Sequence, residues 1–140
     1  MNNNGPIVIV EDNEGAQQLL CAIFEDMEYK NELLFFCDVD EALYYLVHTP
    51  VIPFLILSDV NLKTDTGFSL KKQIHENMPL QLKSIPFLFF STAASRKDIE
   101  LAYFMGCQGF FLKPPSIDIL KDDLNIIMQY WDRCLVPHDM

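Results

Sequence analysis

The amino-acid sequence predicts an α/β protein in which five parallel strands form a doubly wound sheet flanked by five helices. Short apolar runs alternate with amphipathic segments along the chain, and parallel strands need such crossover helices between them. The 140 residues suit one domain. Half of the residues are hydrophobic and 21% are charged, as is typical of a protein with a packed core.

Five apolar runs have the length and composition of strands that are buried on both faces. The first, IVIV, is β-branched throughout, and a proline stands directly before the third and the fourth. The predicted strands are residues 7–10, 33–37, 54–58, 87–91 and 109–112.

Between the strands, apolar residues recur at three- and four-residue spacing, as they do on one face of a helix. The first such stripe runs from Leu20 to Met27. Residues that commonly cap helices stand before three later segments, at Asp38, Ser95 and Ser116. These patterns predict one helix after each strand.

The charge and composition argue against several classes of partner and location. Twenty acidic residues against ten basic ones give a net charge of −10, which should repel nucleic acid and anionic membranes. The amino terminus lacks the features of a signal peptide, and no apolar run approaches the ~20 residues of a membrane span. We therefore expect a cytoplasmic, soluble protein that binds neither nucleic acid nor membrane.

The four cysteines show neither disulfide nor zinc-ligand spacing. They are widely separated, and no histidine lies near them at a ligand spacing. We expect them to be small buried or half-buried residues of a protein in a reducing compartment: Cys21, Cys37, Cys107 and Cys134.

Polar residues follow four of the predicted strands. The carboxyl ends of parallel strands lie at one edge of the sheet, where ligands of such folds bind. The residues expected to meet there are acids, hydroxyls, one amide and one amine: Glu11, Asp12, Asp59, Asn61, Ser91, Thr92 and Lys113.

The chemistry of this set indicates a metal-assisted phosphoryl site. Three clustered carboxylates repel one another unless a cation lies among them. Oxygen ligands with water favour Mg²⁺, which is the predicted cofactor. A metal, the Lys113 amine and a hydroxyl together suit a phosphoryl group, since its transfer depends on positioning and charge neutralisation. One carboxylate can then act as the nucleophile.

The motifs VIVEDN, LILSDVNL, DTGF, PFLFFSTA and GFFLKPP resemble those of response regulator receiver domains, the phospho-acceptors of two-component signalling. The resemblance covers Ile7 to about Leu135. It implies the flavodoxin-like strand order 2-1-3-4-5, which the chemotaxis regulator CheY shares. It also implies a single receiver domain over residues 1–140, with its core at about 6–135 and no output domain, similar to stand-alone regulators.

The resemblance implies a role for each acidic position. Asp59 would accept a phosphoryl group from a histidine kinase or a histidine phosphotransfer protein. Asp12 and Asp59 would hold magnesium, with the backbone carbonyl of Asn61 as a third ligand. Glu11 stands where the family more often has Asp, and it would act through a metal-bound water.

The remaining positions would respond to the phosphate. Ser91 would hydrogen-bond it, with the adjacent Thr92 as the alternative hydroxyl, and Lys113 would pair with another of its oxygens. Phe110 occupies the aromatic switch position and would fill the space that Ser91 vacates. The fourth helix, fifth strand and fifth helix would then repack and present a new face to a downstream protein target that the sequence does not name. Lys63 replaces a proline that is common in the family, so the loop after Asp59 is expected to be less rigid.

The predicted function is a signalling switch rather than an enzyme, with self-phosphorylation and autodephosphorylation as its only chemistry. Two alternatives remain. A degenerate receiver would fold in the same way but act only as an interaction module. A phosphohydrolase of the haloacid-dehalogenase type would need a second Asp two residues after the nucleophile, where Asn61 stands.

Overall fold

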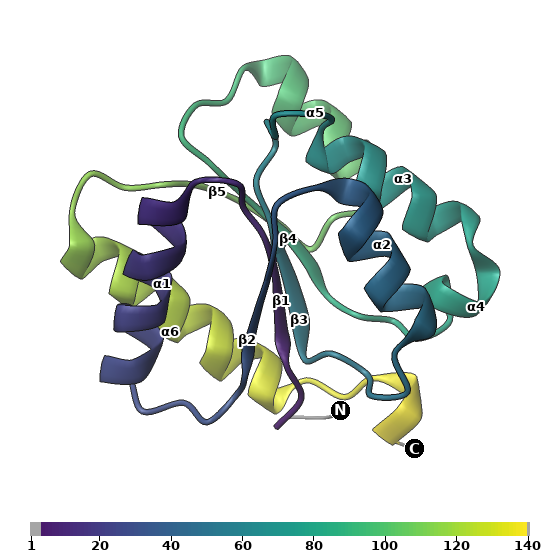
Figure 1. The fold of residues 1–140 in the computed structure, drawn as a ribbon, viewed down its shortest axis with the longest axis horizontal. Helices are drawn as coiled ribbons and strands as arrows, with labels where there is room; N and C mark the ends of the chain where they lie inside the picture. The colour runs from purple at the N-terminus through teal and green to yellow at the C-terminus, as the bar shows by residue number, and fades with distance from the viewer. Residues whose placement is uncertain (1–3, 140) are drawn as a thin grey trace.

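The computed structural model describes residues 4–139 and contains one five-stranded parallel sheet (Figure 1). The strand order is β2-β1-β3-β4-β5, which confirms the order that the family resemblance implied. The strands lie within one residue of the predicted bounds: β1 Ile7–Val10, β2 Leu33–Phe36, β3 Leu55–Ser58, β4 Phe87–Ser91 and β5 Gly109–Leu112.

The described helices include one more α-helix than the sequence predicted. The additional one, α4, is a single turn that follows α3 directly, and the Asn77 side chain caps it by accepting from the Leu80 N–H at 3.1 Å. Four residues are too short to show helical periodicity, so the pattern could not reveal it. The predicted fourth and fifth helices are therefore α5 and α6. The elements are α1 Glu14–Asp26, α2 Val39–His48, α3 Gly67–Glu76, α4 Met78–Gln81, α5 Arg96–Phe104, α6 Ile117–Arg133 and the 3₁₀ turn Pro137–Asp139.

Helices cover both faces of the sheet, as Figure 1 shows. Alternate residues of each strand point to opposite faces, so β1 sends Ile7 and Ile9 to one core and Val8 and Val10 to the other. The first core is closed by α1 and α6, and the second by α2 to α5. No described helix is long and apolar enough to cross a membrane.

A row of phenylalanines lies in the second core, against the face of β4 and β5. Phe89 of β4 is fully buried, and its ring centroid lies 5.2 Å from Phe68, 5.0 Å from Phe87 and 5.8 Å from Phe110. Edge-on and tilted ring pairs of this kind add to the stability gained by burial. The row ties β5 to β4 and α3, and it holds Phe110 against the core.

The burial predicted for the cysteines is right for two of them and wrong for the other two. Cys107 is buried and Cys134 is half-buried, whereas Cys21 and Cys37 are exposed. Cys21 lies on the outer side of α1, and Cys37 follows β2, which is an edge strand with a partner on one side only. Strand and helix periodicity did not predict which cysteines would face outward.

The core beneath α6 gives a direct test of the packing. Leu124 is 1% exposed, whereas Ile126 on the same helix is 54% exposed. Replacing a buried leucine by alanine removes apolar contacts and leaves a cavity, so we expect Leu124→Ala to lower the free energy of unfolding by about 2–5 kcal/mol. Ile126→Ala should change it by no more than about 0.5 kcal/mol. Urea denaturation of both variants measures the difference, and equal losses would contradict the packing described here.

Candidate functional site

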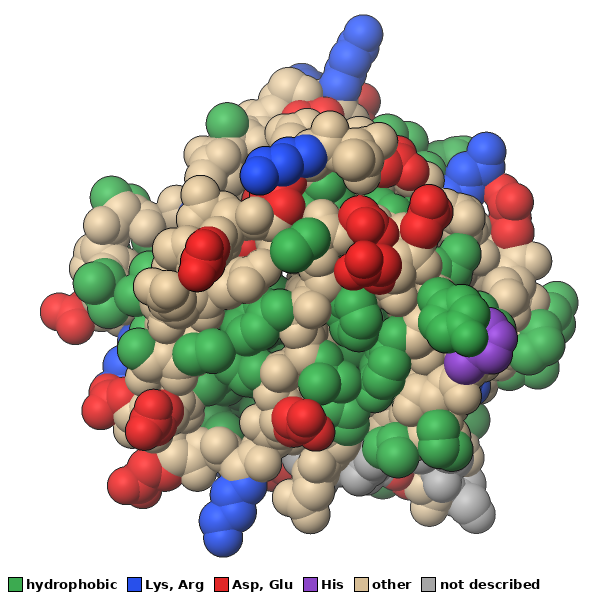
Figure 2. All heavy atoms as spheres, in the orientation of Figure 1, with side chains coloured by type: hydrophobic (Ala, Val, Ile, Leu, Met, Phe, Trp, Pro, Cys, Tyr) green, Lys and Arg blue, Asp and Glu red, His purple; other side chains and the backbone are tan. Residues whose placement is uncertain are grey.

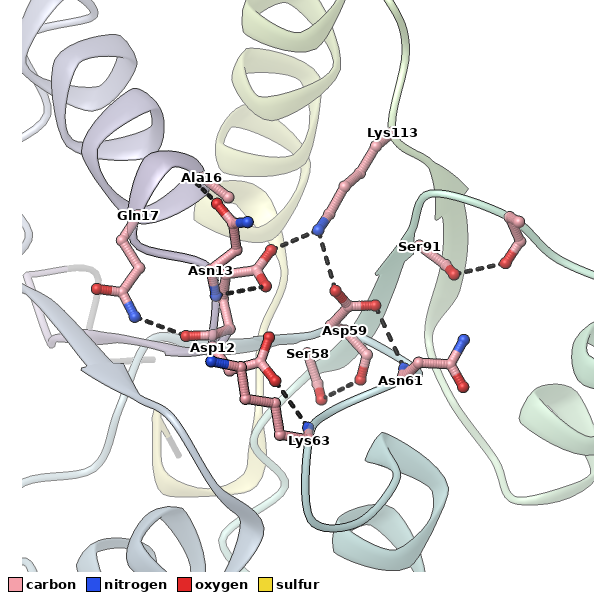
Figure 3. Close-up of polar contacts among 12 residues, drawn as sticks. Asp12, Asn13, Ala16, Gln17, Ser58, Asp59, Asn61, Lys63, Ser91 and Lys113 are labelled. Atoms are coloured by element: carbon pink, nitrogen blue, oxygen red, sulfur yellow. Dashed lines mark hydrogen bonds and ion pairs between the residues drawn. The ribbon is translucent and has the colours of Figure 1, made fainter.

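The backbone places the residues that follow β1, β3 and β5 at one edge of the sheet (Figure 3). The Asp59 N–H donates to the Val10 carbonyl at 2.9 Å, and the Lys113 N–H donates to the Ser91 carbonyl at 2.8 Å. These bonds continue the ladders of the sheet past the last strand residues. Asp59 and Lys113 are therefore held by rigid elements rather than by free loops.

Lys113 binds two carboxylates from two different strand ends. Its Nζ lies 3.1 Å from Asp59 Oδ2 and also donates to Glu11 Oε1. The side chains are 23% exposed for Lys113, 4% for Glu11 and 12% for Asp59. Breaking a pair at this depth would leave an uncompensated charge, which is far more destabilising than the loss of an exposed ion pair. The three residues therefore form one electrostatic unit.

Burial by itself lowers the pKa of the Lys113 amine, because the charged form loses hydration. The hydrogen bonds and charges of Glu11 and Asp59 outweigh this effect, and the net result is a raised pKa. Lys113 is thus a permanent cation at neutral pH, fixed beside the Asp59 carboxylate.

The third predicted acid, Asp12, is turned toward the loop after β3. Its Oδ2 accepts a hydrogen bond of 2.7 Å from the Lys63 backbone N–H (Figure 3). Within residues 4–139, no three Asp, Glu, His or Cys side chains are grouped as metal ligands. The cation that lies between Glu11 and Asp59 is Lys113.

The oxygen atoms at this edge nevertheless suit a hard divalent cation. Asp59 Oδ1 accepts only a long hydrogen bond of 3.4 Å, from the Asn61 N–H, so it keeps capacity for a further partner. Carboxylate oxygens and a backbone carbonyl are the ligands that Mg²⁺ takes in proteins. The donor chemistry fits the metal predicted from the sequence.

Gly67 allows the loop after Asp59 to close tightly. The Gly67 N–H donates to the Val60 carbonyl at 2.8 Å, and Asn61 forms an isolated antiparallel bridge with Thr66. A Cβ at position 67 would lie 2.2 Å from the Asp59 carbonyl oxygen, which no side chain can occupy. Glycine is required here by the close approach of two backbones.

The two candidate hydroxyls have different environments. Ser91 is 1% exposed, and its Oγ donates to the Ala93 carbonyl at 2.6 Å, pointing away from Asp59 in Figure 3. Thr92 lies just past the end of β4 and is exposed. Phe110 is half-buried in β5 opposite Phe89, and it points to the same side of the sheet as Ser91.

Residues that the sequence did not single out also support the site. Gln17 of α1 donates from Nε2 to the Glu11 carbonyl at 2.6 Å, and the Asn13 side chain caps α1 by accepting from the Ala16 N–H at 2.8 Å. Asn13 could have been identified, because asparagine before a helix is a common N-cap. Gln17 gives no such signal. The site also borders an apolar cavity of about 210 Å³ between α1, α6 and the sheet.

The tight contact at Gly67 can be tested by adding a single methyl group. We expect Gly67→Ala to displace the backbone at Asp59 and to destabilise the protein by about 1–3 kcal/mol, because overpacked backbones must shift. Gly15 in α1 is the matched control, since the nearest atom to its added Cβ is the Asn13 side-chain oxygen at 3.2 Å, which is farther away and is not backbone. Gly15→Ala should stay within about 1 kcal/mol of the native protein. Thermal denaturation measures the stability of both variants. If Gly67→Ala is as stable as the native protein, the steric constraint at Gly67 is disproved.

Comparison with known proteins identifies relatives that cover most of this chain. The family model for the response regulator receiver domain matches residues 7–125. The probable methanogenesis regulatory protein FilR2 of Methanothrix harundinacea is 29% identical over 129 residues, which cover 89% of this chain and 82% of that protein. The chemotaxis protein CheY-3 of Vibrio cholerae is 26% identical over 130 residues, which cover 92% of this chain and 95% of that protein.

Solved structures show the same fold. The phosphorylated cyanobacterial phytochrome response regulator RcpA superposes with a TM-score of 0.83 at 25% identity, covering 94% of this chain and 97% of that one. The Mn²⁺-bound form of response regulator Rcp1 superposes with a TM-score of 0.79 at 23% identity, with the same two coverages of 94% and 97%. The fold described above is therefore shared with these response regulators.

Proposed function

Because this chain belongs to the response regulator receiver family, we propose that it is a phospho-acceptor switch in which Asp59 receives a phosphoryl group from a histidine kinase or a histidine phosphotransfer protein. The observation that carries the proposal is the Lys113 ammonium fixed 3.1 Å from Asp59 Oδ2. An acid at a strand end is common. A nearly buried acid that is paired with a permanent cation is unusual, because the cation can also stabilise the negative charge of an incoming phosphoryl group.

The proposed reaction uses the oxygen of Asp59 that Lys113 leaves open. Oδ1 attacks the phosphorus of a phosphohistidine, the P–N bond breaks, and its electron pair returns to the histidine nitrogen. The product is an aspartyl phosphate. Lys113 remains beside it as a counter-charge, so the repulsion between the incoming phosphoryl oxygens and the acidic edge is reduced.

Magnesium is the proposed cofactor of this reaction. Asp12 and Asp59 would hold it with the Asn61 backbone carbonyl, and Glu11 would act through a bound water. The bound metal supplies positive charge that neutralises the phosphoryl oxygens. Support comes from the oxygen donors described above and from the similar regulator Rcp1, which has a Mn²⁺-bound form.

The proposed switch runs from Ser91 to the surface formed by α5, β5 and α6. Ser91 would give up its bond to the Ala93 carbonyl and donate to the phosphate, and Phe110 would move into the space it leaves. This surface already carries exposed apolar residues, with Tyr103 57% and Phe104 89% exposed. A cavity of about 280 Å³ lies on the same side and is lined by Phe110 among others. We propose that a downstream protein in the cytoplasm binds there.

A second candidate function has one observation in its favour. Lys113 already pairs with both Glu11 and Asp59, and Asp12 accepts from the Lys63 N–H, so each of these three carboxylates has a partner without a metal. A receiver that acts only as an interaction module would have this arrangement. The phosphohydrolase alternative gains nothing from the structure, because the amide of Asn61 cannot act as a general acid at the position that needs one.

Phosphorylation can be tested with a small acyl phosphate and Mg²⁺. We expect the native protein to gain one phosphoryl group and Asp59→Asn to gain none, because an amide oxygen is a poor nucleophile. Intact-protein mass spectrometry measures the adduct, and removal of divalent cations with a chelator should abolish it.

Asp65 is the matched control for this experiment. It is an exposed acid in the same loop, and its Oδ1 accepts from the Thr66 N–H, which an asparagine oxygen can also do. Asp65→Asn should be phosphorylated like the native protein. No adduct on the native protein, or an unchanged adduct on Asp59→Asn, would favour the interaction module.

The choice between the two hydroxyls is tested separately. We expect Ser91→Ala to accept the phosphoryl group but to lose the changes in backbone amide chemical shifts along β5 that follow it. Thr92→Ala should keep those changes, because Thr92 is exposed beyond the strand end. NMR spectra of both variants, recorded before and after addition of acyl phosphate, show which hydroxyl is needed. If Thr92→Ala loses the shift changes and Ser91→Ala keeps them, Thr92 is the switch residue.

A further inference from the structure

A buried lysine lies at the other end of the sheet from Asp59. Lys71 belongs to the inward stripe of α3, between Leu70 and Ile74, and is only 5% exposed. Its position would suit an apolar residue, since it lies among the side chains of the second core. A lysine at this depth is unusual unless it has a partner.

Lys71 has no anionic partner among residues 4–139. Its Nζ lies 5.8 Å from the centre of the Phe87 ring, a distance at which a cation is weakly attracted to the ring face. No carboxylate or carbonyl of the described residues accepts a hydrogen bond from it. Because no fully buried side-chain nitrogen of these residues lacks a partner, the Lys71 Nζ retains some contact with solvent. Burial lowers the pKa of the Lys71 amine, and the nearby Cys107 thiol opposes that shift. An ammonium group in this environment gains strongly from any anion that reaches it.

Lys71 lines a cavity of about 180 Å³ that such an anion can enter. The cavity lies at the amino ends of β3, β4 and β5, so it is separate from the acidic edge. Its lining contains no Asp or Glu, although the protein as a whole carries a net charge of −10. The apolar part of the lining consists chiefly of Ile56, Ile74, Leu80, Phe87 and Trp131.

Gln108 supplies a second donor at the same cavity. Its Oε1 accepts from the Phe87 N–H at 2.7 Å, which fixes the orientation of the amide. The NH₂ group of Gln108 has no acceptor among the described residues, and Gln108 lines the cavity together with Lys71. One ammonium and one amide donor beside an apolar wall form a polar anchor with room for a hydrophobic group.

We propose that this cavity is a binding site for a small monocarboxylate with an apolar body, whose carboxylate pairs with Lys71. The size is suitable, because an apolar protein cavity of about 150 Å³ holds benzene. A carboxylate with an apolar body fits better than phosphate, because Lys71 is the only charged side chain of the lining. The other polar residues of the lining, Gln81, Ser84 and Gln108, are neutral, and the rest of the wall is apolar. The proposal does not depend on phosphorylation of Asp59.

Benzoate is a suitable probe, and the protein carries its own reporter. Trp131 is the only tryptophan of the sequence, and it lines the cavity. We expect benzoate to change Trp131 fluorescence in a saturable manner, with calorimetry giving the same dissociation constant. Benzamide and inorganic phosphate should each bind at least about tenfold more weakly, because one lacks the charge and the other the apolar body.

Three substitutions locate the site. Lys71→Met keeps the apolar stem and removes the charge, so benzoate binding should fall at least about tenfold. Lys72→Met is the matched control, because Lys72 is an exposed neighbour that pairs with Glu76 on the surface. The Lys72→Met protein should bind benzoate as tightly as the native protein. Gln108→Glu can still accept from the Phe87 N–H and places a carboxylate beside Lys71. It should raise the melting temperature and weaken benzoate binding.

Each outcome decides the proposal. Binding of benzoate that is lost in Lys71→Met and kept in Lys72→Met and Asp59→Asn supports it. No saturable binding to the native protein overturns it, as does equal binding by Lys71→Met. If benzamide binds as tightly as benzoate, the cavity is only an apolar pocket, and if phosphate binds more tightly, the ligand class is wrong. Gln108→Glu keeps the test informative if Lys71→Met does not fold.

Discussion

The ion pair between Lys113 and the two acids, Glu11 and Asp59, is the interaction on which the acidic edge depends. Two carboxylates from neighbouring strand ends, both nearly buried, would repel each other without it. The sheet brings them together because β1 and β3 are adjacent. The lysine comes from the end of β5, two strands beyond β3. The cation offsets the repulsion between the two carboxylates where water is scarce, and the proposed phosphorylation of Asp59 would depend on that positive charge.

Position 11 holds Glu, where the family more often has Asp, and this longer side chain affects how the positive charge of Lys113 is shared. The longer side chain reaches Lys113 directly, and its other oxygen, Oε2, accepts weakly from the Asn13 N–H at 3.4 Å. Its backbone carbonyl is held by Gln17. Lys113 is therefore shared between Glu11 and Asp59, the acid that we propose is phosphorylated. A metal that entered the edge would compete with Lys113 for Asp59, so metal affinity and the strength of the Lys113 pair are coupled through one carboxylate.

The sequence predicted the fold and the meeting of Asp59 with Lys113, because both follow from short-range patterns and one topological rule. Apolar runs of four or five residues located the strands, and the convergence of parallel strand ends brought Asp59 and Lys113 together. Side-chain directions were not predictable in the same way. Asp12 turns to the Lys63 backbone and Ser91 to the Ala93 carbonyl, because these partners lie in loops whose course no periodicity reveals. The burial of Lys71 was also missed, since periodicity places a residue on a face without showing what fills the space beside it.

The contact between Gly67 and the Asp59 carbonyl has a consequence for reading related sequences. It is a purely steric requirement of the chain path, and it holds whether or not position 59 is ever phosphorylated. A related sequence without Asp59 or Lys113 would lose the ion pair, but its backbone would still need glycine at position 67. In a related sequence, a glycine at position 67 therefore indicates the same chain path, whereas residues 59 and 113 indicate whether the proposed phosphorylation chemistry is retained.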